Sequence, residues 1–247
     1  MIGTTILYIL LVVFLATVIQ SAFGFGQAIV AVPLLALVIP LQIVSPLVVL
    51  LSITIGAVVV IQDWREVHLS SVIWLLVPTF LGIPLGIALL ASSHPHIVKA
   101  LLAILIVAFA GNSLLGRKPP ALSSDSHPWL LGCGFFAGVL GGAYGMNGPP
   151  VVMYGAMRGW SPQHFRATLQ GYFLISGLVA LAGYWYAGLW VTAVTRDFLM
   201  SVLAAVPAIF LGRVINRRLR GHAFLKFAYA ALVCIGVLLL IQAIRGV

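Results

Sequence analysis

The sequence predicts an all-α polytopic membrane protein made of two repeats, and three observations support this fold class. First, 62% of the 247 residues are hydrophobic and 7% are charged, whereas a soluble domain carries about 25% charged residues. Second, the apolar residues form runs that are long enough for helices crossing a bilayer. Third, a short glycine-rich pattern occurs twice, at 21–33 and 141–153, and interrupts an apolar run each time. We therefore expect two repeats, each a broken helix or helical hairpin followed by three transmembrane helices.

The two copies of the pattern read S-A-F-G-F-G-Q-A-I-V-A-V-P and G-G-A-Y-G-M-N-G-P-P-V-V-M. When the two copies are aligned, an aromatic residue stands opposite an aromatic residue, Phe23 with Tyr144, and Gly24 stands opposite Gly145. The amide residues Gln27 and Asn147 align to within one position. Glycine favours conformations outside the helix and proline lacks an N–H donor, so each copy should break its helix. Hydrocarbon tolerates unpaired backbone groups only where they line a cavity. We therefore expect the two copies to face each other across a substrate site near the middle of the membrane.

The first repeat is expected to cover residues 1–118. Its apolar run from Thr4 to about Gln20 resumes after the break, from Ala28 to Val38. Because one crossing needs about 20 residues, a hairpin of two shorter helices fits this run better than one straight helix. Three helices should follow: from Pro40 to Ile61, from Leu69 to Leu90 and from Ile97 to Leu115.

A polar loop at 119–127 separates the halves, and the second repeat is expected to cover residues 128–247. Its broken run extends from Trp129 to about Met157. Three helices should follow it: Pro162 to Tyr186, Asp197 to Val214 and Ala223 to Ile244. The echo between V-P-T-F-L-G at 77–82 and V-P-A-I-F-L-G at 206–212 supports an internal duplication.

The basic residues predict the orientation in the membrane. If both broken runs are hairpins, ten Lys and Arg residues lie on one side and three, Lys99, Arg196 and Arg245, on the other. If both runs cross once, the division becomes eight against five. The hairpin arrangement obeys the positive-inside rule better. It makes the repeats inverted, with both termini outside the cytoplasm of a multi-pass protein in the cell (inner) membrane.

The breaks suggest an anion site, because each can aim the N–H groups of a short helix at a ligand. The four carboxylates, Asp63, Glu66, Asp125 and Asp197, all fall in predicted loops or at helix ends. This disfavours a cation substrate and a carboxylate proton relay, which normally place acidic groups inside the bundle. Proton coupling through the substrate itself or through a histidine stays open. The six histidines have no metal-ligand spacing, and we expect no metal and no cofactor.

The candidate substrate-binding residues lie in the two breaks and in the helix after the second one. Thr168 and Gln170 come just inside that helix and either reach the second break or bond to a neighbouring helix. The candidates are Ser21, Phe23, Gly24, Gly26, Gln27, Tyr144, Gly145, Asn147, Gly148, Thr168 and Gln170. By contrast, the G-x-x-x-G spacings Gly82/Gly86 and Gly134/Gly138 are expected to serve close helix packing.

The paired breaks, the R-A-T of Arg166 to Thr168 and the L-G before the last helix of each half resemble the TauE/SafE family, also described as sulfite exporters or toluene sulfonate uptake permeases. The resemblance covers nearly the whole chain. It implies a carrier of sulfur-containing anions such as sulfite, sulfoacetate, thiosulfate or organic sulfonates. The chain departs from the familiar pattern at G-M-N-G-P-P, where many members carry a longer glycine run.

The hypothesis is therefore a secondary transporter in which one half rocks against the other around a small sulfur-containing anion. An anion channel of the same fold and a non-transporting membrane partner protein are alternatives. An enzyme is not expected, because no paired carboxylates, Ser-His arrangement or metal cluster lies in the membrane. The basic balance is explained by orientation and lipid contact, so no nucleic acid is expected. The sequence does not indicate an oligomeric state.

Overall fold

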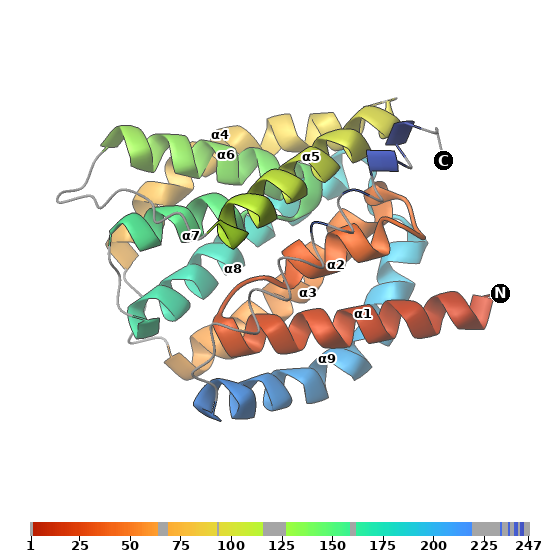
Figure 1. Ribbon diagram of the computed structural model, residues 1–247, viewed down its shortest axis with the longest axis horizontal. Helices are drawn as coiled ribbons and strands as arrows, with labels where there is room; N and C mark the ends of the chain where they lie inside the picture. Colours follow the sequence, from red (N-terminus) through yellow and green to blue (C-terminus); the bar gives the residue numbers. More distant parts are fainter. Residues whose placement is uncertain are drawn as a thin grey trace.

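The structure is a computed structural model that describes residues 2–63, 69–92, 94–115, 127–158 and 162–218, together with residues 233, 237, 240, 241, 243 and 244. Within these residues the regular structure is helical, without strands (Figure 1). The helices are α1 (Ile2–Phe23), α2 (Gln27–Leu35), α3 (Leu41–Asp63), α4 (Leu69–Leu90), α5 (Pro95–Leu114), α6 (His127–Tyr144), α7 (Gly148–Met157), α8 (Pro162–Tyr186) and α9 (Thr192–Arg218).

Four of the described helices contain segments long and apolar enough to cross a bilayer: Thr5–Phe23, Leu41–Val58, Val72–Leu90 and Thr192–Ile215. Helices α5 and α6 contain shorter apolar segments. Large apolar side chains such as Leu85, Phe136 and Leu203 are exposed on the outer faces, which suits contact with lipid and not with water. The predicted all-α polytopic membrane fold is confirmed.

The first broken run forms a hairpin. Helix α1 ends at Phe23, and α2 runs back beside it (Figure 1). The Tyr8 hydroxyl, near the start of α1, donates a hydrogen bond of 2.9 Å to the carbonyl oxygen of Leu34, near the end of α2. A single kinked crossing would place these two residues at opposite ends, so the chain reverses between them.

This hairpin is less symmetric than the sequence suggested. The expected first helix was short, but α1 has 22 residues and α2 only nine. The helix continues through Ser21 to Phe23 and stops where Gly24 adopts a φ of 83°, a conformation that residues other than glycine rarely adopt. A helix long enough for a full crossing is therefore followed by one that returns only part of the way.

The second broken run has the same order of elements. Helix α6 ends at Tyr144, where the N–H of Gly145 bonds to Gly141 O (2.9 Å) and that of Met146 to Leu140 O (3.1 Å). These bonds close the helix end around Gly145, whose φ is 66°. Helix α7 then starts at Gly148 and packs against α6.

The closest packing joins helices from different halves of the chain. Helix α4 packs along α6, α9 along α1, and α3 against α8. If α1 to α4 correspond to α6 to α9, the first two pairs are equivalent, as a duplicated fold requires. The pairing supports the predicted repeats, which stay a prediction. The predicted last helix, 223–244, lies almost entirely outside the described residues, and α9 starts at Thr192, not at Asp197.

Glycines bring α4 and α6 into backbone contact. A Cβ added at Gly82 would overlap Phe135 O, and one added at Gly86 would overlap Val139 O. A Cβ at Gly138 would in turn overlap Thr79 O. The close packing predicted for these glycines is confirmed, and it holds the end of α6, and with it the second break, against α4.

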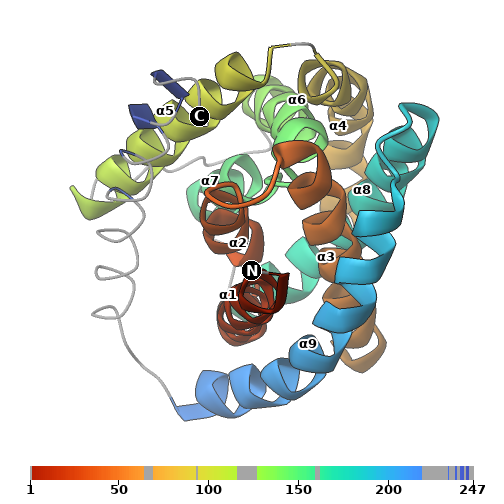
Figure 2. The same ribbon diagram turned by 90° about the vertical axis from the view of Figure 1, so that its right-hand side faces the viewer.

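The end-on view places the short helices inside the bundle. In Figure 2, α1, α2 and α7 lie toward the middle, while α4, α5, α8 and α9 lie around them. The side chains of α2 are accordingly buried at six of its nine positions. The two segments that follow the breaks are thus shielded by longer helices, as irregular backbone in a membrane requires.

Candidate functional site

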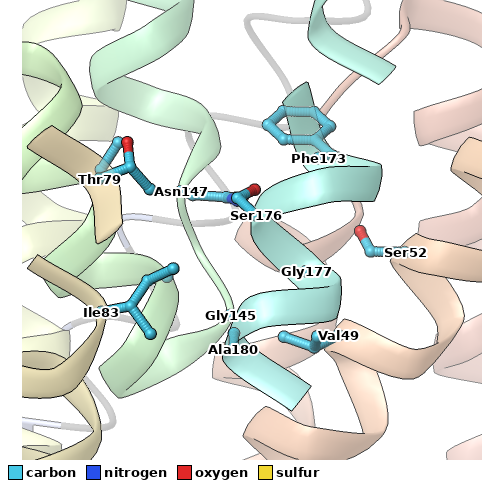
Figure 3. Close-up of a pocket in the computed structure, with 12 residues that line it drawn as sticks. Val49, Ser52, Thr79, Ile83, Gly145, Asn147, Phe173, Ser176, Gly177 and Ala180 are labelled. Carbon is cyan, nitrogen blue, oxygen red and sulfur yellow. The ribbon is translucent and has the colours of Figure 1, made fainter. Parts of the chain in front are cut away.

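A small pocket lies directly beneath the second break, between α3, α4, α6 and α8. Figure 3 shows Asn147 and Ser176 pointing toward one another across it. The cavity is small: its volume of about 10 Å³ is room for roughly one water molecule. The pocket is lined by Val49, Ser52, Thr79, Ile83, Ala137, Gly141, Gly145, Asn147, Phe173, Ser176, Gly177 and Ala180.

The polar residues of this pocket come from the middle of long helices. Ser52 is the twelfth of the 23 residues of α3, and Thr79 is the eleventh of the 22 residues of α4. Ser176 is the fifteenth of the 25 residues of α8. The pocket is therefore about equally far from both ends of the bundle.

The amide of Asn147 is held in a defined orientation. Its Nδ2 donates a hydrogen bond of 2.8 Å to the Ser176 hydroxyl, which donates one of 2.7 Å to the carbonyl oxygen of Tyr172. A carboxamide nitrogen carries two hydrogens, so one N–H of Asn147 remains for another acceptor. Ser176 therefore fixes a donor at the edge of the pocket.

Backbone donors lie beside that amide. The backbone N–H groups of Gly145 and Met146 donate to carbonyl oxygens of α6. Those of Asn147 and Gly148 make no such bond in the part of the chain that the structure describes. Pro149 and Pro150, which follow, have no N–H. The ten-residue helix α7 starts at this point, so the positive end of its dipole lies at the break. This combination of neutral donors and a dipole favours an anion.

The opposite wall of the pocket carries hydroxyl groups. The Thr79 hydroxyl oxygen lies 2.7 Å from Leu75 O, 2.9 Å from Gly134 O and 2.8 Å from the Tyr172 hydroxyl. These side chains are buried. The residues that line the pocket include no charged side chain. A ligand there would be bound by dipoles alone.

A second buried polar cluster surrounds the first break. The Gln170 side chain donates a hydrogen bond of 2.9 Å to Gly24 O, at the end of α1, and its own oxygen lies 3.4 Å from Gln20 Nε2. Gln27, the first residue of α2, has no exposed surface, and neither polar atom of its amide has a partner in the described part of the chain. A buried amide without partners is costly, and a bound ligand or water would satisfy it.

The remaining candidate residues have other surroundings. Ser21 faces α9, because its Cβ lies 2.5 Å from where a Cβ at Gly212 would stand, and its hydroxyl has no partner among the described residues. The hydroxyl group of the buried Tyr144 donates a hydrogen bond of 2.8 Å to Val98 O of α5. Thr168 is buried, Phe23 is half-buried at the end of α1 and Gly26 precedes α2 with a φ of 107°.

The structure therefore does not bring all eleven candidates to one cavity. Gly145 and Asn147 line the pocket, and Gly148 lies next to Phe173 on its rim. The residues of the first break do not line it. Both clusters border α8, however, where Gln170 and Ser176 are six residues apart, or about 9 Å along the helix.

Ten of the twelve lining residues were not among the candidates, and four of these ten matter for the site: Ser52, Thr79, Phe173 and Ser176. The three hydroxyl residues lie within long apolar runs, where Ser and Thr side chains commonly bond between membrane helices, and this was the available signal. Phe173 is one of 13 phenylalanines, and no pattern distinguishes it.

Comparisons with known proteins identify the family of the chain. The sequence model of the family described as Sulfite exporter TauE/SafE matches residues 9–239. A curated relative, the "Probable sulfite/organosulfonate exporter TauE" of Cupriavidus necator, is 26% identical over 184 residues, which cover 74% of this chain and 71% of the relative. No solved structure matches the chain. Since the family match covers most of the chain, the protein belongs to the TauE/SafE family and is a multi-pass membrane transporter, not an enzyme.

Proposed function

We propose that the chain is a secondary carrier that moves a small sulfur-containing anion, such as sulfite, sulfoacetate or another organosulfonate. The observation that carries this proposal is the pocket beneath the second break, where the Asn147 amide is oriented by Ser176 in the middle of the bundle. The pocket offers neutral donors and no acidic side chain, which suits an anion. The name of the relative supplies the chemistry of that anion.

The buried Gln27 extends the site to the first break. Within the residues that the structure describes, its amide is unpartnered at the start of α2, and the Gln170 side chain of α8 bonds to Gly24 O, three residues before it. The remaining candidates act in shaping these breaks: Gly24, Gly26, Gly145 and Gly148 as backbone, and Ser21, Phe23, Tyr144 and Thr168 as the side chains around them. An anion passing between the breaks would meet donors from both halves.

The small pocket fits a closed state of a carrier. With room for about one water molecule, it cannot hold sulfite unless the surrounding helices separate. In this conformation it is therefore closed to an anion, as expected of one state in an alternating-access cycle.

Flux of radiolabelled sulfite into proteoliposomes tests the proposal. The wild-type protein should carry sulfite, and the variant with both Gln27→Ala and Asn147→Ala should lose most of this flux. Asn112→Ala is a matched control, because this amide is exposed near the end of α5, outside the pocket, and it should leave the flux unchanged.

Different failures have different meanings. No sulfite or sulfonate flux with the wild-type protein would contradict the function. Normal flux with the double variant would contradict the site. Unitary currents in planar bilayers would assign the protein to the channels instead of the carriers.

A further inference from the structure

Phe173 occupies a special position between the two breaks. It lies three residues after Gln170, which bonds to the first break, and three before Ser176, which bonds to the second. Residues at this spacing lie along one face of a helix. The ring is 5% exposed, lines the pocket and packs edge-on against Tyr172, with ring centroids 5.8 Å apart. The apolar cluster that contains it also packs against Phe25, in the first break.

The ring also limits the pocket on the side of the second break. A Cβ added at Gly148 would lie 3.7 Å from Phe173 Cζ, an ordinary contact distance. Figure 3 shows the ring at one end of the pocket, away from Ile83 and Gly145. Phe173 therefore closes the end of the pocket that lies next to Gly148.

Five of the other eleven lining residues have no side chain that could rotate away from a ligand. Gly141, Gly145 and Gly177 have no side chain to move, and each lies against a neighbour. A Cβ at Gly141 would lie 3.1 Å from Asn147 Cβ, and one at Gly177 would lie 2.9 Å from Ile53 Cγ1. Ala137 and Ala180 likewise have no rotatable bulk. Phe173 has the largest side chain of the lining, so shortening it would free the most volume.

We propose that Phe173 is the specificity-determining residue that sets the upper size of the transported anion. This inference rests on the proposed function and refines its substrate class to sulfur oxyanions with no organic group or with a very short one. A longer alkyl chain would have to occupy the volume of the ring, and interiors packed to crystal-like density accept added methylenes only at a cost. Removing the ring would provide that volume.

Competition experiments in proteoliposomes test the inference with anions that differ only in chain length. The uptake of radiolabelled sulfite is measured against increasing methanesulfonate, ethanesulfonate and propanesulfonate. In the wild-type protein, inhibition should weaken steeply as the alkyl chain grows. In Phe173→Ala, the inhibition constant for propanesulfonate relative to that for methanesulfonate should fall at least about tenfold, the discrimination typical of a close-fitting apolar wall.

Two further variants keep the test decisive. Phe173→Leu is a milder truncation and should shift the same ratio in the same direction if the alanine variant does not fold. Phe136→Ala is the matched control, because this phenylalanine is 62% exposed on the outer face of α6, and it should leave the ratio unchanged. An unchanged ratio in both folded Phe173 variants, or equal inhibition by all three sulfonates in the wild type, would overturn the inference while sulfite transport persists. Absence of sulfite and sulfonate flux in the wild type would overturn the proposed function itself.

Discussion

At the scale of single residues, the hydrogen bond between Asn147 and Ser176 connects the second break to α8. Ser176→Ala removes the acceptor that orients the amide. A net hydrogen bond contributes about 1 kcal/mol, so we expect KM for sulfite to rise about fivefold with little change in kcat. Flux at several sulfite concentrations separates the two constants.

Thr54→Ala is the matched control for this variant. The Thr54 hydroxyl bonds to Leu50 O within its own helix (2.9 Å), as the Ser176 hydroxyl bonds to Tyr172 O, and Thr54 does not line the pocket. It should leave KM unchanged. Equal KM values for Ser176→Ala and the wild type would show that Ser176 does not position the amide.

Gln27 provides a second prediction at this scale, because it separates function from stability. Its amide is buried and lacks partners among the described side chains, so replacing it with an apolar residue of similar shape should be neutral or stabilising. Gln27→Met should therefore keep or raise the melting temperature while lowering sulfite flux. A fall in both, measured by thermal unfolding in detergent and by flux, would indicate a purely structural amide.

At the scale of helices, the glycines between α4 and α6 determine whether the second break is held in place. Gly138→Ala would push a methyl group into the backbone of Thr79, and overpacking of this kind costs about 1–3 kcal/mol. We expect a lower melting temperature and a lower yield of monodisperse protein, both measurable by size-exclusion chromatography after heating.

Gly132→Ala is the control on the same helix. A Cβ there would meet no atom within 4 Å, and alanine favours the helix by about 1 kcal/mol over glycine. This variant should be as stable as the wild type or slightly more so. If both variants behaved alike, backbone contact between α4 and α6 would not be what stabilises the pair.

Helices were also the level at which the sequence was most informative. Apolar runs and the glycine-rich patterns predicted that helices break within 21–33 and 141–153, and the breaks come after Phe23 and after Tyr144, where the glycines that follow have positive φ. They did not predict that Asn147 bonds to Ser176, 29 residues later. Such contacts depend on which faces of two helices meet, and helices that are apolar on every face carry little information about that.

For the site, the sequence likewise indicated the residues of the breaks but not which way their side chains face. Gly145 and Asn147 were found because they lie in the break itself. Ser21 was included for its place in the pattern, but the side of α1 on which it lies packs against α9. To assign such a residue to a cavity, one must know which face of the helix points toward the cavity. The sequence of the break does not give that orientation.

At the scale of the whole molecule, the packing suggests which parts move together. The sequence favoured rocking of residues 1–118 against 128–247, yet the tightest pairs, α4 with α6 and α1 with α9, each contain one helix from either half. Backbone contact through glycines resists sliding. We therefore expect the two pairs to move as units, with α3 and α8 between them.

The orientation of the bundle is the last prediction, and α5 provides the test. Ser92 lies in the turn before this helix, and Asn112 lies near its end, about 26 Å along the helix from its first residue, Pro95. In a background with Cys133→Ala and Cys234→Ala, Ser92→Cys should react with a membrane-impermeant maleimide in intact cells. Asn112→Cys should react only after permeabilisation, because the basic residues 117 and 118 follow it and favour the cytoplasm.

The reverse labelling pattern would invert the molecule and place both termini inside. Labelling of both cysteines from one side would mean that α5 does not cross the membrane and that the first half has an even number of crossings. In that last case the halves would not be inverted, and a cycle based on two opposed repeats would have to be abandoned.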